Sequence, residues 1–184
     1  MDYRQWCEDM RQAIERYMSR MQAIFRGIQL EPDTVTEEVD EAALRIAAES
    51  GLPPSLLELY ASIREASFAN LHNAYFIHSL AWVLDSLHRP DIPAWAPEAT
   101  DERLAVFASD GGGRTFAVGY RSGTVFRLPV GGVVDQVYDG SIDSIGPGEI
   151  AKDIPDFLAR LLQIARAFGD EPDEDDEDEE LPVM

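Results

Sequence analysis

Residues 103–138, RLAVFASDGGGRTFAVGYRSGTVFRLPVGGVVDQVY, decide the fold class of this chain. They contain four segments of strand length, which are residues 103–109, 114–120, 124–128 and 133–138. The connections between these segments are short and most contain glycine, which favours antiparallel pairing over a crossover. In the second segment apolar residues alternate with small or polar ones, as expected of a strand with one face on a core. We therefore expect an antiparallel meander in this stretch.

Helix signals precede the meander. Residues 2–26 carry apolar side chains at seven-residue intervals, which predicts a long amphipathic helix with Asp2 as its N-cap. Such a repeat can also mark a coiled coil, but three to four repeats that include tyrosine and methionine favour a helix lying on its own domain. Thr34 and Glu37 resemble a capping box, so a second helix is expected from there to Ser50. Its inward-facing residues should be Val39, Ala43, Ile46 and Ala47.

Further elements are expected on both sides of the meander. A third helix should follow the proline pair at 53–54, and the aromatic residues 75–77 should form a strand. Ser79 is expected to cap a short helix through Leu87, and residues 153–168 should form a closing helix. This order predicts an α+β fold, with a central antiparallel sheet of about four to six strands flanked by N-terminal helices and a C-terminal helix.

The charge of the chain restricts its partners. Among 184 residues there are 35 Asp or Glu and 15 Lys or Arg, which gives a net charge of −20. Ten of these acids lie in residues 170–180, and a charge of −10 remains without them. Such a surface repels phosphate backbones and anionic lipid headgroups, so we expect neither a nucleic-acid partner nor a membrane partner.

Composition also suggests how the chain is organised. We expect an N-terminal amphipathic helix in residues 1–30 that packs on a domain formed by residues 31–169. An acidic disordered tail should follow in residues 170–184. With one cysteine, no signal peptide and no membrane-spanning stretch, we expect a cytoplasmic protein that is a monomer or a weak dimer.

Four motifs occur in an order that suggests a family. They are GLPPSLLELY at residues 51–60, NAYFIHS at 73–79, DGGG at 110–113 and IAKDIPDFL at 150–158. Together they resemble the SMI1/KNR4 (SUKH) family over roughly residues 34–166. The resemblance implies an α+β domain with a central antiparallel sheet. The chain departs from the family at Asn73-Ala74, where Asn-Gly is usual, and the helix in residues 2–26 has no counterpart in the family's core.

The resemblance implies binding more than catalysis. Bacterial members of the family are frequently immunity proteins that bind and neutralise a cognate toxin, and other members have regulatory roles. We therefore expect a non-enzymatic protein-binding module, with an immunity protein as the leading interpretation. Its sheet face and rim loops would occlude the active site of a protein toxin, and the acidity of the chain suits a basic one. A regulatory or scaffolding protein that recruits a partner through its N-terminal helix is the alternative, and a hydrolase is a distant third.

The residues offer few signs of a catalytic or metal site. The three histidines lack metal-site spacing, and Cys7 lies in the apolar stripe of the first helix, as a buried structural thiol would. The glycines at 111–113 lie between two strands, which favours a hairpin turn over a phosphate loop. Residues 139–143 lack the ligands of a calcium loop. We expect no catalytic residue, metal or cofactor, although a triad assembled in space escapes sequence analysis.

Candidate partner contacts lie in or beside the expected hairpins. They are acidic, aromatic or arginine residues, chosen because tyrosine and arginine are favoured interface anchors. The set is Asp110, Arg114, Tyr120, Asp135, Tyr138 and Asp139.

Overall fold

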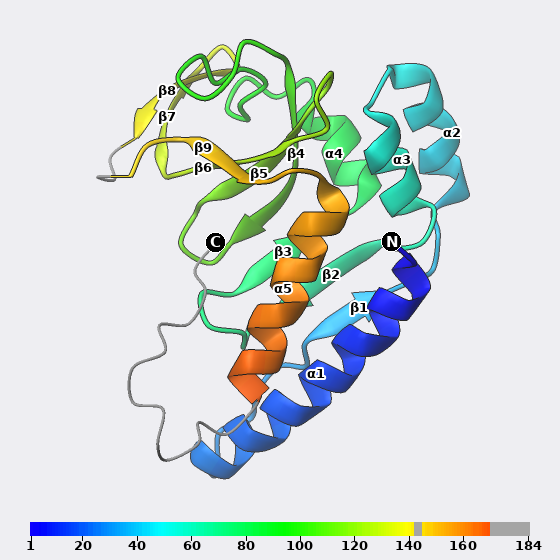
Figure 1. Ribbon diagram of the computed structural model, residues 1–184, viewed down its shortest axis with the longest axis vertical. Coiled ribbons are helices and arrows are strands. Elements are labelled where there is room, and N and C mark those ends of the chain that lie inside the picture. Colours follow the sequence, from blue (N-terminus) through cyan, green and yellow to red (C-terminus); the bar gives the residue numbers. More distant parts are fainter. Residues whose placement is uncertain (142–144, 170–184) are drawn as a thin grey trace.

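The computed structural model describes residues 1–141 and 145–169, which form a seven-stranded sheet, a separate two-stranded hairpin and five helices (Figure 1). The helices are α1 (Tyr3–Ile24), α2 (Glu41–Ser50), α3 (Pro54–Tyr60), α4 (Leu80–Ser86) and α5 (Ile154–Gly169). The strands are β1 (Thr34–Thr36), β2 (Glu65–Phe68), β3 (Tyr75–Ile77), β4 (Leu104–Asp110), β5 (Thr115–Gly119), β6 (Val125–Leu128), β7 (Gly131–Val134), β8 (Val137–Ser141) and β9 (Gly148–Ala151). The large sheet has the order β1-β2-β3-β4-β5-β6-β9, and all its neighbouring strands are antiparallel. The predicted α+β class is confirmed.

One face of the large sheet is covered by α1 and α5, which lie side by side (Figure 1). Aromatic rings fill the space under α5, where Phe157 lies 5.4 Å from Phe107 and 5.2 Å from Phe116 between ring centroids. The indole nitrogen of the buried Trp6 donates a hydrogen bond to the carbonyl of Leu158 at 2.8 Å, which joins α1 to α5. The buried stripe of α1 thus belongs to the core.

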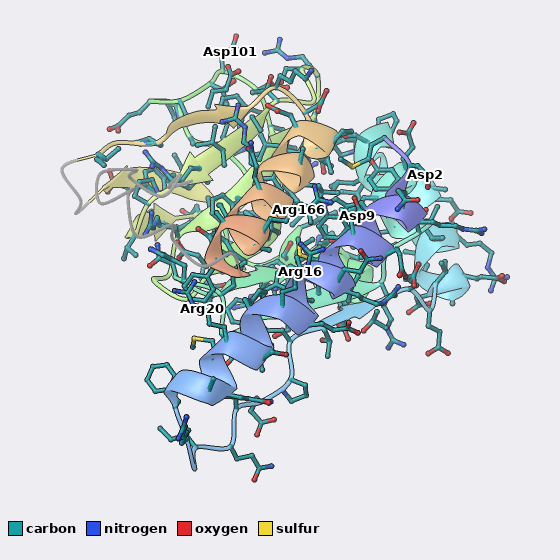
Figure 2. The ribbon with its side chains drawn as sticks, turned by 60° about the horizontal axis from the view of Figure 1, so that its bottom comes forward. Asp2, Asp9, Arg16, Arg20, Asp101 and Arg166 are labelled. Carbon is teal, nitrogen blue, oxygen red and sulfur yellow. The ribbon has the colours of Figure 1, made fainter. Side chains whose placement is uncertain are left out.

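An ion pair at the surface also joins these two helices. A guanidinium nitrogen of Arg166 on α5 lies 2.8 Å from the Asp9 carboxylate on α1 (Figure 2). At the start of α1, Asp2 accepts hydrogen bonds from the backbone nitrogens of Arg4 and Gln5, as expected of an N-cap. The predicted first helix is present as α1, and it packs against α5. The predicted acidic tail in residues 170–184 lies outside the described residues.

Within residues 1–141 and 145–169, a second apolar cluster covers the other face of the sheet over β4, β5 and β6. It is formed by Leu104, Val106, Ala117, Phe126 and Leu128 together with Ala96 and Tyr138. Ala96 comes from the segment before β4, and Tyr138 comes from β8. Over β1, β2 and β3 the described part of the chain leaves this face open as a groove.

The predicted helix start at Thr34 and Glu37 is wrong. Residues 34–36 form β1, which pairs with β2, and α2 begins at Glu41. Asp40 is the true N-cap, since its carboxylate accepts a hydrogen bond from the Ala43 nitrogen at 2.9 Å. The β-branched run Thr-Val-Thr prefers an extended conformation, and this preference prevails over the capping pattern.

The predicted inward position of Ile46 is also wrong, because its side chain is 60% exposed. Ala43 and Ala47 are the buried residues of α2, with Leu44 partly buried beside them. At 3.6 residues per turn, Ile46 lies roughly a third of a turn away from the centre of this stripe. Val39 precedes the helix altogether.

The prediction of one strand over residues 133–138 is wrong. This segment contains the end of β7, a two-residue turn and the start of β8, which form a hairpin. Asp135 and Gln136 have φ values of 48° and 66°, as the central residues of a type I′ turn do. The strands β2 and β9 were not expected, and with β1 they bring the sheet to seven strands instead of four to six. The strands predicted near β3, β4, β5 and β6 are present.

Candidate functional site

The β7–β8 hairpin is fastened to the segment that precedes β4. The Trp95 nitrogen donates a hydrogen bond to the Gln136 carbonyl at 3.0 Å, and the Tyr138 nitrogen donates one to the Trp95 carbonyl at 2.8 Å. The side-chain amide of Gln136 donates two more, to the carbonyls of Leu87 and Arg89, both at 3.0 Å. The hairpin is therefore held in one position although it is not part of the large sheet.

Three large apolar side chains lie exposed on this hairpin and beside it. Val134 and Val137 are paired across the two strands, and Trp95 forms an isolated parallel bridge with Val137. Paired residues place their side chains on the same side, so the three form one surface. Their exposed fractions are 60% for Val134, 38% for Val137 and 43% for Trp95. We call these three residues the hairpin patch.

Two carboxylates lie next to the hairpin patch. Asp135 is exposed in the turn, and Asp139 is exposed two residues after Val137 on the same side of β8. Between them Tyr138 points the other way, where it is buried and donates a hydrogen bond from its hydroxyl to the Pro129 carbonyl at 3.0 Å. The predicted contact residues Asp135 and Asp139 thus lie on the accessible side of the hairpin, and Tyr138 is buried beneath it.

A close approach of backbones holds this arrangement together. A Cβ atom on Gly131 would lie 2.0 Å from the Gly140 carbonyl oxygen and 2.8 Å from the Tyr138 hydroxyl. No side chain fits there. Glycine at position 131 therefore allows the base of the hairpin to close over the tyrosine.

Asp110 and Arg114, two other predicted contacts, have a structural role in the β4–β5 turn. The buried Asp110 carboxylate accepts hydrogen bonds from the nitrogens of Gly112 and Arg114, both at 2.9 Å. The side-chain nitrogen Nε of Arg114 also lies 2.8 Å from this carboxylate. The pair closes the turn, so Asp110 has little surface to offer a partner.

Tyr120 lies beyond the opposite end of β5 from Arg114. The Arg103 guanidinium lies 5.1 Å from the centre of its ring, and its hydroxyl is buried. The structure therefore does not bring the six predicted contacts into one surface. Sequence analysis missed the three residues of the hairpin patch, and the only signal for two of them was the pair of valines flanking Asp135 and Gln136.

A groove crosses the open half of the sheet. Its volume is about 280 Å3. It is lined by side chains from β1, β2, β3 and α4, which include Thr34, Glu65, Ser67, Phe76, His78 and Trp82. The His78 and Trp82 rings are stacked, with their centroids 4.1 Å apart and their planes at 30°. Aromatic and polar groups thus meet on one concave surface.

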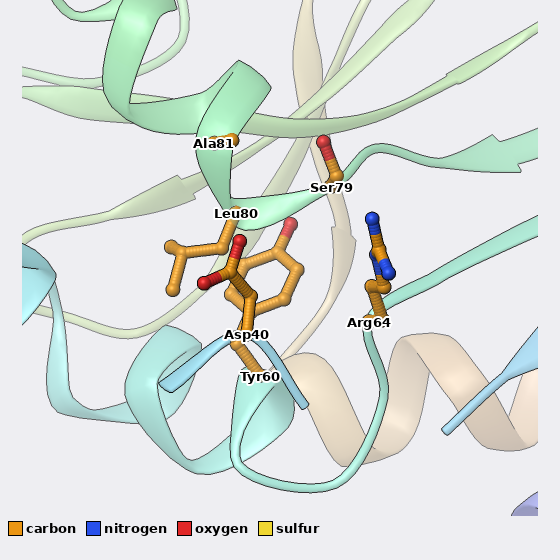
Figure 3. Close-up of a pocket in the computed structure, with 6 residues that line it drawn as sticks. All are labelled: Asp40, Tyr60, Arg64, Ser79, Leu80 and Ala81. Atoms are coloured by element: carbon orange, nitrogen blue, oxygen red, sulfur yellow. The ribbon is translucent and has the colours of Figure 1, made fainter. Parts of the chain in front are cut away.

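A smaller pocket of about 40 Å3 shares Ser79 with this groove (Figure 3). Asp40 and Arg64 lie on two sides of it, and Tyr60 forms part of its wall. The Tyr60 hydroxyl donates a hydrogen bond to the His78 carbonyl at 2.7 Å. This pocket has room for water molecules but not for a substrate.

Neither a metal centre nor a reactive thiol emerges from the residues that the structure describes. No group of three or more His, Cys, Asp or Glu side chains in residues 1–141 and 145–169 is placed to hold a metal ion. Burial raises the pKa of the Cys7 thiol to about 11, so it is protonated at neutral pH. No helix in these two ranges is both long enough and apolar enough to cross a membrane.

The turn before β3 has an unusual backbone. His72 and Ala74 have φ values of 37° and 55°, which lie in the left-handed region that glycine prefers. Ala74 is the residue at which the SMI1/KNR4 resemblance would lead one to expect glycine. Comparisons with protein-family models and with curated proteins find no match to this chain. Membership of that family therefore stays a prediction.

Proposed function

We propose that this protein is a non-enzymatic protein-binding module, and specifically an immunity protein that neutralises a toxin by covering its active site. The hairpin patch is the observation that carries the proposal. Tryptophan is among the residues most often found as an interface anchor, and here Trp95 is exposed beside two exposed valines on a hairpin held by hydrogen bonds. A rigid apolar surface of this kind loses little conformational entropy on binding.

The charge around the hairpin patch favours a basic partner. Asp135 and Asp139 are exposed next to the apolar residues, and the whole chain carries a net charge of −20. A basic toxin would be attracted over a distance and would associate faster at low salt. We propose that this encounter takes place in the cytoplasm and that the protein acts as a monomer or a weak dimer.

The alternative is a regulatory or scaffolding protein that recruits its partner through α1. Phe25 and Ile28 are exposed where α1 ends, and they favour this function. The rest of the apolar stripe, with Cys7, Met10 and Tyr17, is buried in the protein's own core. Little of α1 is therefore left for a partner, and we prefer the hairpin patch.

The product of the neighbouring gene provides the test, since an immunity protein is expected to lie beside the gene of its toxin. The purified toxin should bind the full chain, and Trp95→Ala and Val134→Ser should each weaken binding at least ten-fold by calorimetry. Ile46→Ser is the matched control, since it changes an equally exposed aliphatic residue on α2 and should alter the Kd less than two-fold. Both hairpin variants should also stop protecting cells that express the toxin.

Two results would contradict the proposal. The first is unchanged toxin binding in both hairpin variants. The second is a loss of binding in Phe25→Ser or Ile28→Ser with the hairpin variants unaffected, which would favour the alternative through α1.

A further inference from the structure

The antiparallel register places two rows of side chains on the floor of the groove. Thr34 is paired with Ser67, and Ser67 is paired with Phe76, so these three form the first row. Glu65 begins the second row, and extending the β2–β3 register by one pair places it opposite His78. Residues on one row alternate in the strand with residues that point into the core, so both rows face the groove.

Hydrogen-bond acceptors dominate these rows. Glu65 is exposed, and within residues 1–141 and 145–169 its carboxylate has no hydrogen-bond or ion-pair partner. The Thr34 and Ser67 hydroxyls can accept hydrogen bonds beside it. Burial lowers the pKa of His78, so at neutral pH its ring is uncharged and keeps one nitrogen as an acceptor. Glu65 is the one formally charged side chain among the residues that line the groove.

Aromatic rings provide the other half of the surface. Phe76 is half-buried on the floor, and Trp82 is stacked against His78 at the end of the groove. A cation over an aromatic face is attracted by the quadrupole of the ring, and a planar guanidinium can also stack on the ring. An anion would be repelled by the negative faces of the rings and by the Glu65 carboxylate.

The surroundings of the groove are more acidic than basic. Asp40 lines the neighbouring pocket, and Glu38 lies 3.9 Å from Arg64, which lines the same pocket. Because Arg64 is already opposed by these carboxylates, it does little to offset the charge of Glu65.

We propose that this groove binds the side chain of an arginine presented by a protein partner. A guanidinium has five N–H donors and no acceptor, which complements a carboxylate, two hydroxyls and a neutral imidazole. It is also the cation best suited to lie flat on an aromatic ring such as that of Phe76. This proposal rests on the proposed function in one respect, which is that the arginine belongs to a protein partner. The groove itself is separate from the hairpin patch.

The experiment uses an arginine fragment and therefore needs no partner. N-acetylarginine amide is titrated into the 15N-labelled full chain, and the amide signals and the Trp82 indole signal are followed by NMR. We expect saturable shifts at Glu65, Ser67 and Trp82. N-acetylcitrulline amide has the same length without the charge, and it should give no saturable shift over the same concentrations.

Two variants make the test specific. Glu65→Gln should weaken arginine binding at least five-fold. Glu149→Gln removes an equally exposed carboxylate from the far edge strand β9 and should change the Kd less than 1.5-fold. Phe76→Leu keeps an apolar side chain but removes the ring, and it should weaken binding two- to five-fold.

Equal binding of citrulline, equal effects of the two glutamine variants, or shifts centred away from β1, β2 and β3 would overturn the proposal. Trp95→Ala and Val134→Ser should leave fragment binding unchanged. A protein that binds arginine but not the toxin would therefore disprove the proposed function alone, and the reverse result would disprove the groove alone.

Discussion

Single residues in this protein carry local strain that the surrounding contacts maintain. Ala74 has a left-handed backbone at φ 55°, and next to it the Asn73 carbonyl accepts a hydrogen bond from the Gly111 nitrogen at 2.8 Å. A Cβ atom at position 111 would lie 2.7 Å from that same carbonyl oxygen. The turn before β3 and the β4–β5 turn therefore fit each other only with this backbone.

Replacing Ala74 by glycine tests the strain. A non-glycine residue in the left-handed region destabilises the folded state by about 1–2 kcal/mol, and glycine relieves this strain. Glycine also gives the unfolded chain more conformational freedom, which lowers the free energy of unfolding by about 0.4–1 kcal/mol. We expect Ala74→Gly to raise the free energy of unfolding by about 0.5 kcal/mol in urea titrations. The control Ala48→Gly, at an exposed position inside α2, should lower it by about 1 kcal/mol. A destabilising effect of Ala74→Gly would show that the strain is not there.

Among the elements, α1 contributes most clearly to the core although it stands apart in sequence from the sheet. Trp6 is buried against α5 and bonded to the Leu158 carbonyl. We expect Trp6→Ala to lower the free energy of unfolding by about 3–5 kcal/mol, because it opens a cavity and leaves a carbonyl unpaired. Phe25→Ala, at the exposed end of the same helix, should change it by less than about 0.5 kcal/mol. Similar small effects of both variants would mean that α1 is a detachable extension.

Elements with strong periodicity or with clear turn signals around them could be predicted, and short strands without such signals could not. The stripes of α1 and α5 and the alternation in β5 follow from residues near in sequence. By contrast β2 and β9 have four residues each, which is too few to show a pattern. The turn at Asp135 and Gln136 lacks the glycine that marks most type I′ turns, so the hairpin was predicted as one strand.

The candidate site was predictable only in part for the same reason. Asp135 and Asp139 were identified by their position near an expected turn. Trp95 reaches the patch through backbone pairing with Val137, which is distant in sequence and leaves no local signal. Tyr138 was expected at the surface, but the alternation of β8 turns it inward.

At the scale of the whole molecule, buried tyrosines make stability depend on alkaline pH. Burial, and then the hydrogen bond that its hydroxyl donates to Asp33, raise the pKa of Tyr17 above its usual range. Burial alone does the same to the pKa of Tyr60, and it raises the pKa of Tyr3 to about 12. The folded state thus keeps protons that the unfolded state releases above about pH 10.

The free energy of unfolding should therefore be nearly level between pH 8 and pH 9 and fall above pH 10. The slope should approach about 1.4 kcal/mol per pH unit for each of Tyr17 and Tyr60. Urea titrations between pH 8 and pH 11.5 measure this slope. Tyr17→Phe should reduce the slope by the contribution of one tyrosine, about 1.4 kcal/mol per pH unit. A stability that stays constant up to pH 11.5 would contradict the assignment.

The β7–β8 hairpin is held by its own hydrogen bonds, so substitutions in the hairpin and substitutions in the large sheet act independently. Because β7 and β8 pair with each other and with Trp95, changes in residues 133–137 leave the register of the seven strands intact. Under the proposed function, specificity can therefore diverge in this short segment while the scaffold is conserved. Exchanging it between two proteins of this architecture would move the choice of partner from one to the other, provided that Gly131 and the Gln136 anchor are retained.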